Sequence, residues 1–252
     1  ASVAVFKDAA VSAVESVQLI KSLTFTVAGL KDGVNETVTL DGSSFSLTNG
    51  STGTTTTNGM TYTVVVASGT ATVTLSKTTG IDSAAAALLV NGIEYKNTNA
   101  NDPTVGDRVF TLTQVVDTGT TNNTTTLSIA STVAVTAVND VPTLSATATN
   151  NTFTEGAGTA QGAAVAVFSG AAVSAVESAQ KIQSLTFTVS GLLDGASETV
   201  TVDGTTFTLS GSPTGTTATN AMTYTVSVTG DTATVTLTKT AGILGTAATT
   251  LV

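Results

Sequence analysis

The segment SLTFTV occupies residues 22–27 and returns unchanged at residues 184–189. Its Leu, Phe and Val residues alternate with hydroxyl-bearing residues, which is the period of a β-strand with one buried face. Glycine-containing turns such as DGSS (41–44) and ASGT (67–70) separate segments of this kind, as β-hairpins require. The alternation recurs in TYTVVV (61–66), TATVTL (70–75), VFTLTQVV (109–116), STVAVTAV (131–138) and matching segments of the second half. The sequence therefore predicts an all-β chain built of β-sandwiches.

Two segments depart from this alternation. DSAAAALLVNG (82–92) is rich in Ala, with Asp82 or Ser83 as an N-cap and Gly92 as an end signal, and it predicts one short helix in each repeat. The segment AAVSAVES, which ends at Ser16, fits a loop or a single helical turn as well as a strand.

The chain is an internal repeat with a constant offset. Phe6 matches Phe168, Glu15 matches Glu177, and Met60 matches Met222, so the period is 162 residues without a gap. Roughly two-thirds of the overlapping positions are identical, which indicates a tandem duplication.

A seam between the copies lies in AVNDVPTLS (137–145), where Asn139, Asp140 and Pro142 form a turn signal before a new strand. We therefore expect one domain at residues 1–142 that lacks its first strand, and a second at residues 143–252. Because Val252 matches Val90, the second domain lacks the C-terminal strands of the first. We expect those strands to be supplied by a continuation of the chain, or by another copy through β-strand complementation.

Composition narrows the range of functions. The net charge is −9, and only 10% of residues are charged, against about 25% in typical domains. With eight basic residues, nucleic acid and anionic membranes are poor partners. No apolar run approaches the ~20 residues that span a bilayer, so we expect no membrane insertion. Cys, His and Trp are absent, which removes disulfides, the commonest general base and the commonest transition-metal ligand. We therefore predict that the chain is not an enzyme.

Three segments carry a resemblance to a known family: FTEG (153–156), NGIEYKNTNANDPTVGDRVFTLTQVVDTG (91–119) and VAVTAVNDVPTLS (133–145). With them the chain resembles the bacterial cadherin-like (Ig-like) tandem repeats of large secreted adhesins and biofilm matrix proteins. The resemblance implies sandwiches of seven or more strands repeated end to end, an extracellular or cell-surface location, and Ca²⁺ at the domain junctions. It places the junction ligands at Asp117, Asp140, Glu155 and Glu177. VSAVES (173–178) offers one carboxylate where the family commonly has a D-x-D cluster.

Several polar residues allow two interpretations of their role. Glu15 and Glu177 fit a calcium or junction contact, or a solvated surface carboxylate. Asp32 and Asp41 precede glycines, which is typical of turn chemistry. The loop NANDPTVGDR (99–108) holds an acid pair, Asp102 and Asp107, that suggests glycosidase chemistry, or else an Asp–Arg pair that holds the loop.

Lysine is kept in both copies only at Lys77 and Lys239. This lysine fits an exposed strand end, or a covalent bond to an Asn side chain of the kind found in some sandwich adhesins.

Together these features predict a structural module. We expect the stalk of a bacterial adhesin or a surface or matrix fibre, in which neighbouring copies of the repeat stack end to end. The alternative is a carbohydrate- or receptor-binding adhesin module that recognises a host or matrix glycan.

Overall fold

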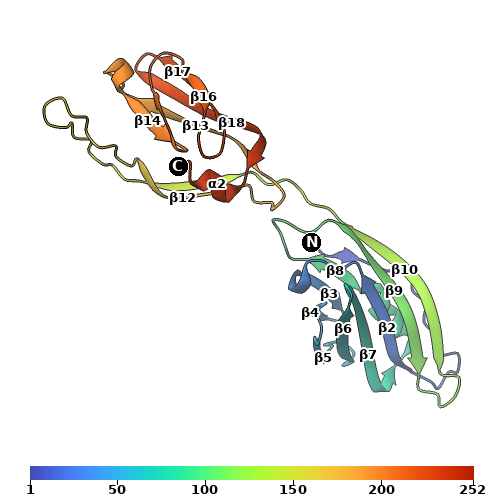
Figure 1. Cartoon of the computed structure of the whole chain (residues 1–252). Helices are drawn as coiled ribbons and strands as arrows, with labels where there is room; N and C mark the ends of the chain where they lie inside the picture. Colours follow the sequence, from blue (N-terminus) through green and yellow to red (C-terminus); the bar gives the residue numbers. More distant parts are fainter. The chain divides into compact units, whose positions relative to one another are not determined.

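The computed structural model describes residues 1–252 and divides them into two compact units, Ala1–Val138 and Asn139–Val252 (Figure 1). The division falls inside the seam at residues 137–145 and four residues before the boundary expected from sequence. No helix in the structure has the length and apolar character needed to cross a bilayer.

Unit 1 is a sandwich of two antiparallel sheets. The smaller sheet has the order β1-β8-β3-β4, and the larger has the order β10-β9-β2-β7-β6-β5. Their bounds are β1 Val3–Ala4, β2 Ile20–Ala28, β3 Glu36–Leu40, β4 Ser43–Ser46, β5 Thr52–Thr54, β6 Thr61–Ala67, β7 Thr70–Ile81, β8 Glu94–Asn97, β9 Gly106–Asp117 and β10 Thr124–Val135. A short 3-10 helix, η1 (Gly33–Asn35), precedes β3.

The core of unit 1 follows from the alternating pattern. In β2, Leu23, Phe25 and Val27 are buried, while the Thr residues between them are partly exposed. They pack with buried residues of the smaller sheet, and Tyr95 of β8 meets Phe110 of β9 edge-on with ring centroids 5.8 Å apart. The two sheets therefore close on one hydrophobic core, and the predicted all-β sandwich is confirmed.

The hairpin turns take the expected backbone form. Asp41 and Gly42, between β3 and β4, both have positive φ angles, as do Ser68 and Gly69 between β6 and β7. Two consecutive positive φ values define the turn whose twist matches that of antiparallel strands, and Gly adopts this conformation at no steric cost.

The predicted helix is present in both units, at different lengths. In unit 1, α1 spans Ser83–Asn91, and the Asp82 side chain caps it by accepting a hydrogen bond from the Ala85 N–H (2.7 Å). In unit 2, α2 spans only Gly245–Thr249, and the capping position is Leu244, which has no side-chain acceptor. The two helices begin at matching positions, and α2 is shorter at its C-terminal end.

Unit 2 repeats the central part of this sandwich. Its strands are β11 Thr143–Ala148, β12 Phe168–Ser174, β13 Ile182–Ser190, β14 Thr199–Val202, β15 Thr205–Thr208, β16 Thr214–Thr216, β17 Thr223–Thr229 and β18 Thr232–Ile243, with a 3-10 helix η2 at Gly195–Ser197. They form the sheets β13-β18-β17-β16, β14-β15 and β11-β12. Through the 162-residue offset, β13 corresponds to β2, β14 to β3, and β18 to β7.

The segment AAVSAVES differs between the units. In unit 2 its first residues belong to β12, which pairs with β11, whereas in unit 1 the matching residues form no strand. In both units the segment ends in a turn at the glutamate, Glu15 or Glu177. The loop that joins β11 to β12 extends away from the rest of unit 2 (Figure 1).

Candidate functional site

Two charged residues stand at inward positions of the strand pattern in unit 1. Glu36 is followed in β3 by the buried Val38 and Leu40, and Arg108 is followed in β9 by the buried Phe110 and Leu112. Both charged side chains are fully buried, at 0% exposure, and Arg108 is the only arginine of the chain. Buried charges are tolerated only when they are paired and hydrogen-bonded, so their partners determine what this site does.

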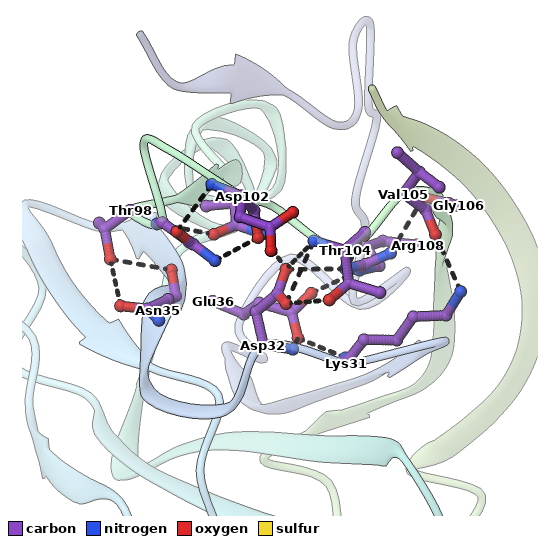
Figure 2. A network of polar contacts seen from close by, with 12 residues as sticks. Lys31, Asp32, Asn35, Glu36, Thr98, Asp102, Thr104, Val105, Gly106 and Arg108 are labelled. Atoms are coloured by element: carbon purple, nitrogen blue, oxygen red, sulfur yellow. Dashed lines mark hydrogen bonds and ion pairs between the residues drawn. The ribbon is translucent and has the colours of Figure 1, made fainter. Parts of the chain in front are cut away.

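The Arg108 guanidinium is held from several directions (Figure 2). Its Nε donates a hydrogen bond to Glu36 Oε1, and its Nη2 lies 3.4 Å from Asp32 Oδ2. Nη1 donates to the main-chain oxygen of Gly106 (3.0 Å), and Nη2 donates to that of Thr104 (3.0 Å). The arginine therefore satisfies two carboxylates and also fixes the loop from which it comes.

The Glu36 carboxylate also accepts several hydrogen bonds. Its Oε1 accepts a second hydrogen bond from the Tyr95 hydroxyl (2.8 Å), and its Oε2 accepts from the main-chain N–H groups of Lys31 and Asp32 (2.7 and 2.9 Å). β3, β8 and β9 are thereby joined to the turn before η1. We call Asp32, Glu36, Tyr95 and Arg108 the clamp.

Asp32 has a larger role than the turn chemistry expected from sequence. Its carboxylate accepts hydrogen bonds from Asn97 Nδ2 (2.5 Å), Thr104 N (2.9 Å) and Thr104 Oγ1 (2.5 Å), in addition to facing Arg108. These donors come from β8 and from the loop before β9. Asp32 therefore ties the first half of the module to its second half.

The clamp holds its groups in their charged or hydrogen-bonded forms. Burial opposes the ionisation of Asp32, but hydrogen bonds from Thr104 and Asn97 and the charge of Arg108 outweigh it, so the pKa of Asp32 lies below its ordinary value. Burial likewise opposes the charge on Arg108, yet Glu36 raises the pKa of this group above its usual range. Burial and the hydrogen bond to Glu36 raise the pKa of the Tyr95 hydroxyl. These ionised and hydrogen-bonded side chains therefore stabilise the contacts between the strands that carry them.

A second polar network occurs in both units. Asp41 accepts hydrogen bonds from Thr55 Oγ1 and from the side chain of Asn58, and Lys77 Nζ donates to the main-chain oxygen of Asn58 (2.6 Å). In unit 2 the matching residues, Asp203, Thr217, Asn220 and Lys239, make the same contacts. Lys77 thus holds the loop between β5 and β6 by a hydrogen bond to the main chain, and Lys239 does the same between β16 and β17. The carboxylate of Asp41 joins the loop of unit 1 to the hairpin turn between β3 and β4.

Two of the four predicted metal ligands, Asp140 and Glu177, meet in unit 2. The main-chain N–H of Asp140 donates to Glu177 Oε1, and Gln180 Nε2 donates to Asn139 Oδ1 (2.5 Å). Glu177 is only 7% exposed, and its other oxygen, Oε2, is buried without a hydrogen-bond partner. A buried carboxylate oxygen without a donor from the protein is uncommon, so Glu177 differs from the other buried carboxylates of the chain.

The third predicted ligand, Asp117, lies beside the matching turn of unit 1. With the Gln18 amide oriented to donate, its nitrogen lies 2.9 Å from Asp117 Oδ2 and 3.2 Å from Glu15 Oε2. Asp117 also accepts from the N–H of Gly119 (2.7 Å). Glu15 itself is exposed.

The repeat relates these two half-sites to each other. Glu15 and Gln18 of unit 1 match Glu177 and Gln180 of unit 2, so the same turn contacts Asp117 in one unit and Asp140 in the other. The structure has no group of three or more acidic residues that could hold a metal ion. The fourth predicted ligand, Glu155, is exposed in the loop between β11 and β12, and no hydrogen bond or ion pair joins it to Asp140 or Glu177.

The turn that presents this glutamate has an uncommon backbone. Val14 and Val176, one residue before the glutamates, have φ angles of 67° and 70°. Each valine N–H is hydrogen-bonded to the serine two residues earlier (3.0 Å in both units). A β-branched residue in the left-handed region is strained, and such strain persists where the surrounding contacts enforce it.

Comparison with known proteins adds nothing to this picture. No protein-family model matches the chain, and neither the curated proteins nor the solved structures include a significant match. The fold and the contacts described above therefore carry the functional argument.

The clamp was missed by sequence reasoning, although a signal was present. Glu36 matches Glu198 at the 162-residue offset, but this recurrence by itself indicates no partner for either glutamate. Both Glu36 and Arg108 occupy the buried phase of a two-residue alternation, at 36-38-40 and 108-110-112. Opposite charges at inward positions of two strands indicate a buried pair.

The repeat provides a matched test of the clamp. We expect Glu36→Gln to destabilise unit 1 by about 3–5 kcal/mol, because it leaves Arg108 buried without its anion. Glu198→Gln, the same change in unit 2, should cost far less, because no arginine faces Glu198. Urea unfolding, monitored in each unit by hydrogen exchange, would measure the loss of stability in both variants. Equal losses in the two variants would contradict a role for the buried pair.

The lowered pKa of Asp32 predicts acid sensitivity. A carboxyl group whose folded pKa lies below its ordinary value of 3.8 contributes stability above about pH 3.8, and this contribution is lost as the pH falls through the folded pKa. Asp32→Asn should therefore lower the stability of unit 1 at neutral pH and flatten its decline in acid. Asp194→Asn is the matched control, because the donors to Asp32 have no counterpart in residues 139–252. Thermal unfolding measured from pH 7 to pH 2 would check this. The prediction is wrong if the stability of unit 1 in the Asp32→Asn variant falls with pH as steeply as in the unchanged chain.

Proposed function

We propose that this chain is a structural module of a bacterial extracellular fibre or adhesin stalk, in which copies of a 162-residue sandwich repeat provide length and stiffness without catalysis. The observation that carries the proposal is the gapless repeat, because its two copies share the central strands β2–β7 and β13–β18, their hairpin turns and the loop-closing network. Near-identical units in tandem suit a mechanical role, in which stability comes from each unit and its contacts with its neighbours.

The internal contacts of the module favour resistance to stretching. The clamp joins the first half of unit 1 to its last strands through Glu36, Asp32 and Arg108. β9 lies between β2 and β10 and forms long antiparallel ladders with both. Because β9 and β10, the last strands of unit 1, are joined to β2 and β3, a pulling force would have to break many hydrogen bonds together.

A cation at the VSAVES turn is part of this proposal. Glu177, with its buried unpartnered oxygen, would be the principal ligand, and Asp140 lies in contact with it. A third carboxylate, equivalent to Asp117, would come from the later part of the same module, since Asp117 adjoins the matching turn of unit 1. Carboxylate and amide oxygens are the ligands that Ca²⁺ prefers. Asp140 belongs to the segment that precedes β11, so a bound cation would stiffen the connection between modules.

The stalk proposal predicts an extended particle of regular spacing. Electron microscopy of a chain carrying several consecutive 162-residue repeats should show rods with evenly spaced beads. Removal of Ca²⁺ by a chelator should increase their bending without dissolving the beads. Collapsed or randomly coiled particles, with tight binding of a single module on a glycan array, would instead favour the carbohydrate-binding alternative.

Calcium binding can be tested on the chain extended after Val252 by the sequence of residues 91–138, which adds the counterpart of Asp117. Isothermal titration should give a dissociation constant on the order of 0.1–1 mM, as is usual for extracellular modules. Glu177→Gln should weaken this binding at least ~10-fold, because it removes the buried anionic ligand. Glu155→Gln is the control and should leave the binding unchanged, since Glu155 contacts neither Asp140 nor Glu177. An equal effect of both variants, or no heat at millimolar Ca²⁺, would refute this site.

A further inference from the structure

We infer that unit 2 is an acceptor for one particular partner, a polypeptide segment with the sequence of residues 91–138, and that Glu198 and Asp194 form the pocket for its arginine. This inference deepens the proposed function, since it names the contact by which a module is completed. It concerns a binding surface, so it can be tested whether or not the chain forms a stalk.

The open edges of unit 2 define the surface. In unit 1, β2 pairs with both β7 and β9, and β3 pairs with both β4 and β8. In unit 2, β13 pairs only with β18, and β14 pairs only with β15. Each of these strands presents a row of main-chain donors and acceptors that its counterpart uses, and such edges are templates for strand addition.

Burial in the two units shows which side chains the absent strands would cover. Phe25, Val27 and Val38 are fully buried in unit 1, whereas the matching Phe187, Val189 and Val200 are only partly buried. Val5 is 7% exposed and its main chain is hydrogen-bonded to Ile93 and Ser131, whereas the matching Val167 is 61% exposed. The residues that make the difference in unit 1 all lie in β8, β9, β10 or directly before β8.

The acceptor for the arginine is already formed. Oε2 of Glu198 accepts hydrogen bonds from the main-chain N–H groups of Leu193 and Asp194 (2.9 and 3.1 Å), as Oε2 of Glu36 does from Lys31 and Asp32. The other oxygen, Oε1, accepts the Arg108 and Tyr95 hydrogen bonds in unit 1, and in unit 2 it accepts none. A preorganised Glu198 carboxylate beside an open edge favours a segment that carries a cation at the matching register.

The strand register in which Tyr95 and Arg108 point inward makes unit 2 specific for this segment. Tyr95 and Arg108 lie on neighbouring parts of one continuous segment, and in unit 1 they reach the same oxygen of Glu36 from two different sheets. A strand shifted by one residue would turn both side chains away from the core and leave the carboxylates unpaired. An unrelated β-strand could pair with the edges but would not satisfy Glu198.

The test uses the full chain and an isolated polypeptide of residues 91–138. We expect a one-to-one complex by native mass spectrometry, and slower hydrogen exchange at β13 and β14. The Arg108→Met segment should bind at least ~100-fold more weakly, since truncating one partner of a buried charge pair removes this much affinity or more. Glu198→Gln in the chain should weaken binding of the unchanged segment, whereas Glu155→Gln should not.

A covalent version guards against aggregation of the free segment. Because Val252 matches Val90, residues 91–138 can be joined directly after Val252 in the register of unit 1. This extended chain should protect the amides of β13 and β14, and its Arg108-equivalent→Met variant should lose that protection. The inference would be overturned by unprotected edges in the extended chain, by equal affinity of the Arg108→Met segment, or by self-association of the chain that the segment does not reverse. A failure of the rod-like assembly described above would leave these results unaffected.

Discussion

The buried pair between Glu36 and Arg108 is the constraint on which the module depends. A sandwich made of Thr, Val, Ala and Gly has few large side chains with which to select one strand arrangement, and aromatic residues are only 4% of the chain. Alternation alone permits many registers, because one Thr-Val strand resembles another. A charge pair that is fully buried tolerates only one register, since any shift leaves an uncompensated charge in the core.

The same pair explains how the two sheets and the loops act together. Glu36 receives two main-chain hydrogen bonds from the turn before η1, and Arg108 donates two to the loop before β9. Tyr95 connects the pair to β8 and packs against Phe110 in the core. Polar and apolar contacts therefore enforce one arrangement of the strands.

The second unit shows which features of the module form from residues close together in the sequence. It keeps the turn chemistry, the loop-closing lysine and the preformed Glu198 carboxylate, since these depend on residues close together in the sequence. Burial is incomplete at Phe187 and Val189, whose unit 1 counterparts lie in β2 beside β9. Local structure and global closure are thus separable in this fold, and the charge pair belongs to closure.

The sequence by itself determined the β-sandwich class, the 162-residue repeat, the hairpin turns and the helix capped by Asp82, because each depends on neighbours in the chain or on a period of two residues. It also pointed to Glu177 and Asp140, which the fold brings into contact. Only the tertiary structure decided that Asp32 and Glu36 belong with Arg108, more than seventy residues away. Charge pairing across such a distance depends on which strands become neighbours, and alternation carries no record of that choice.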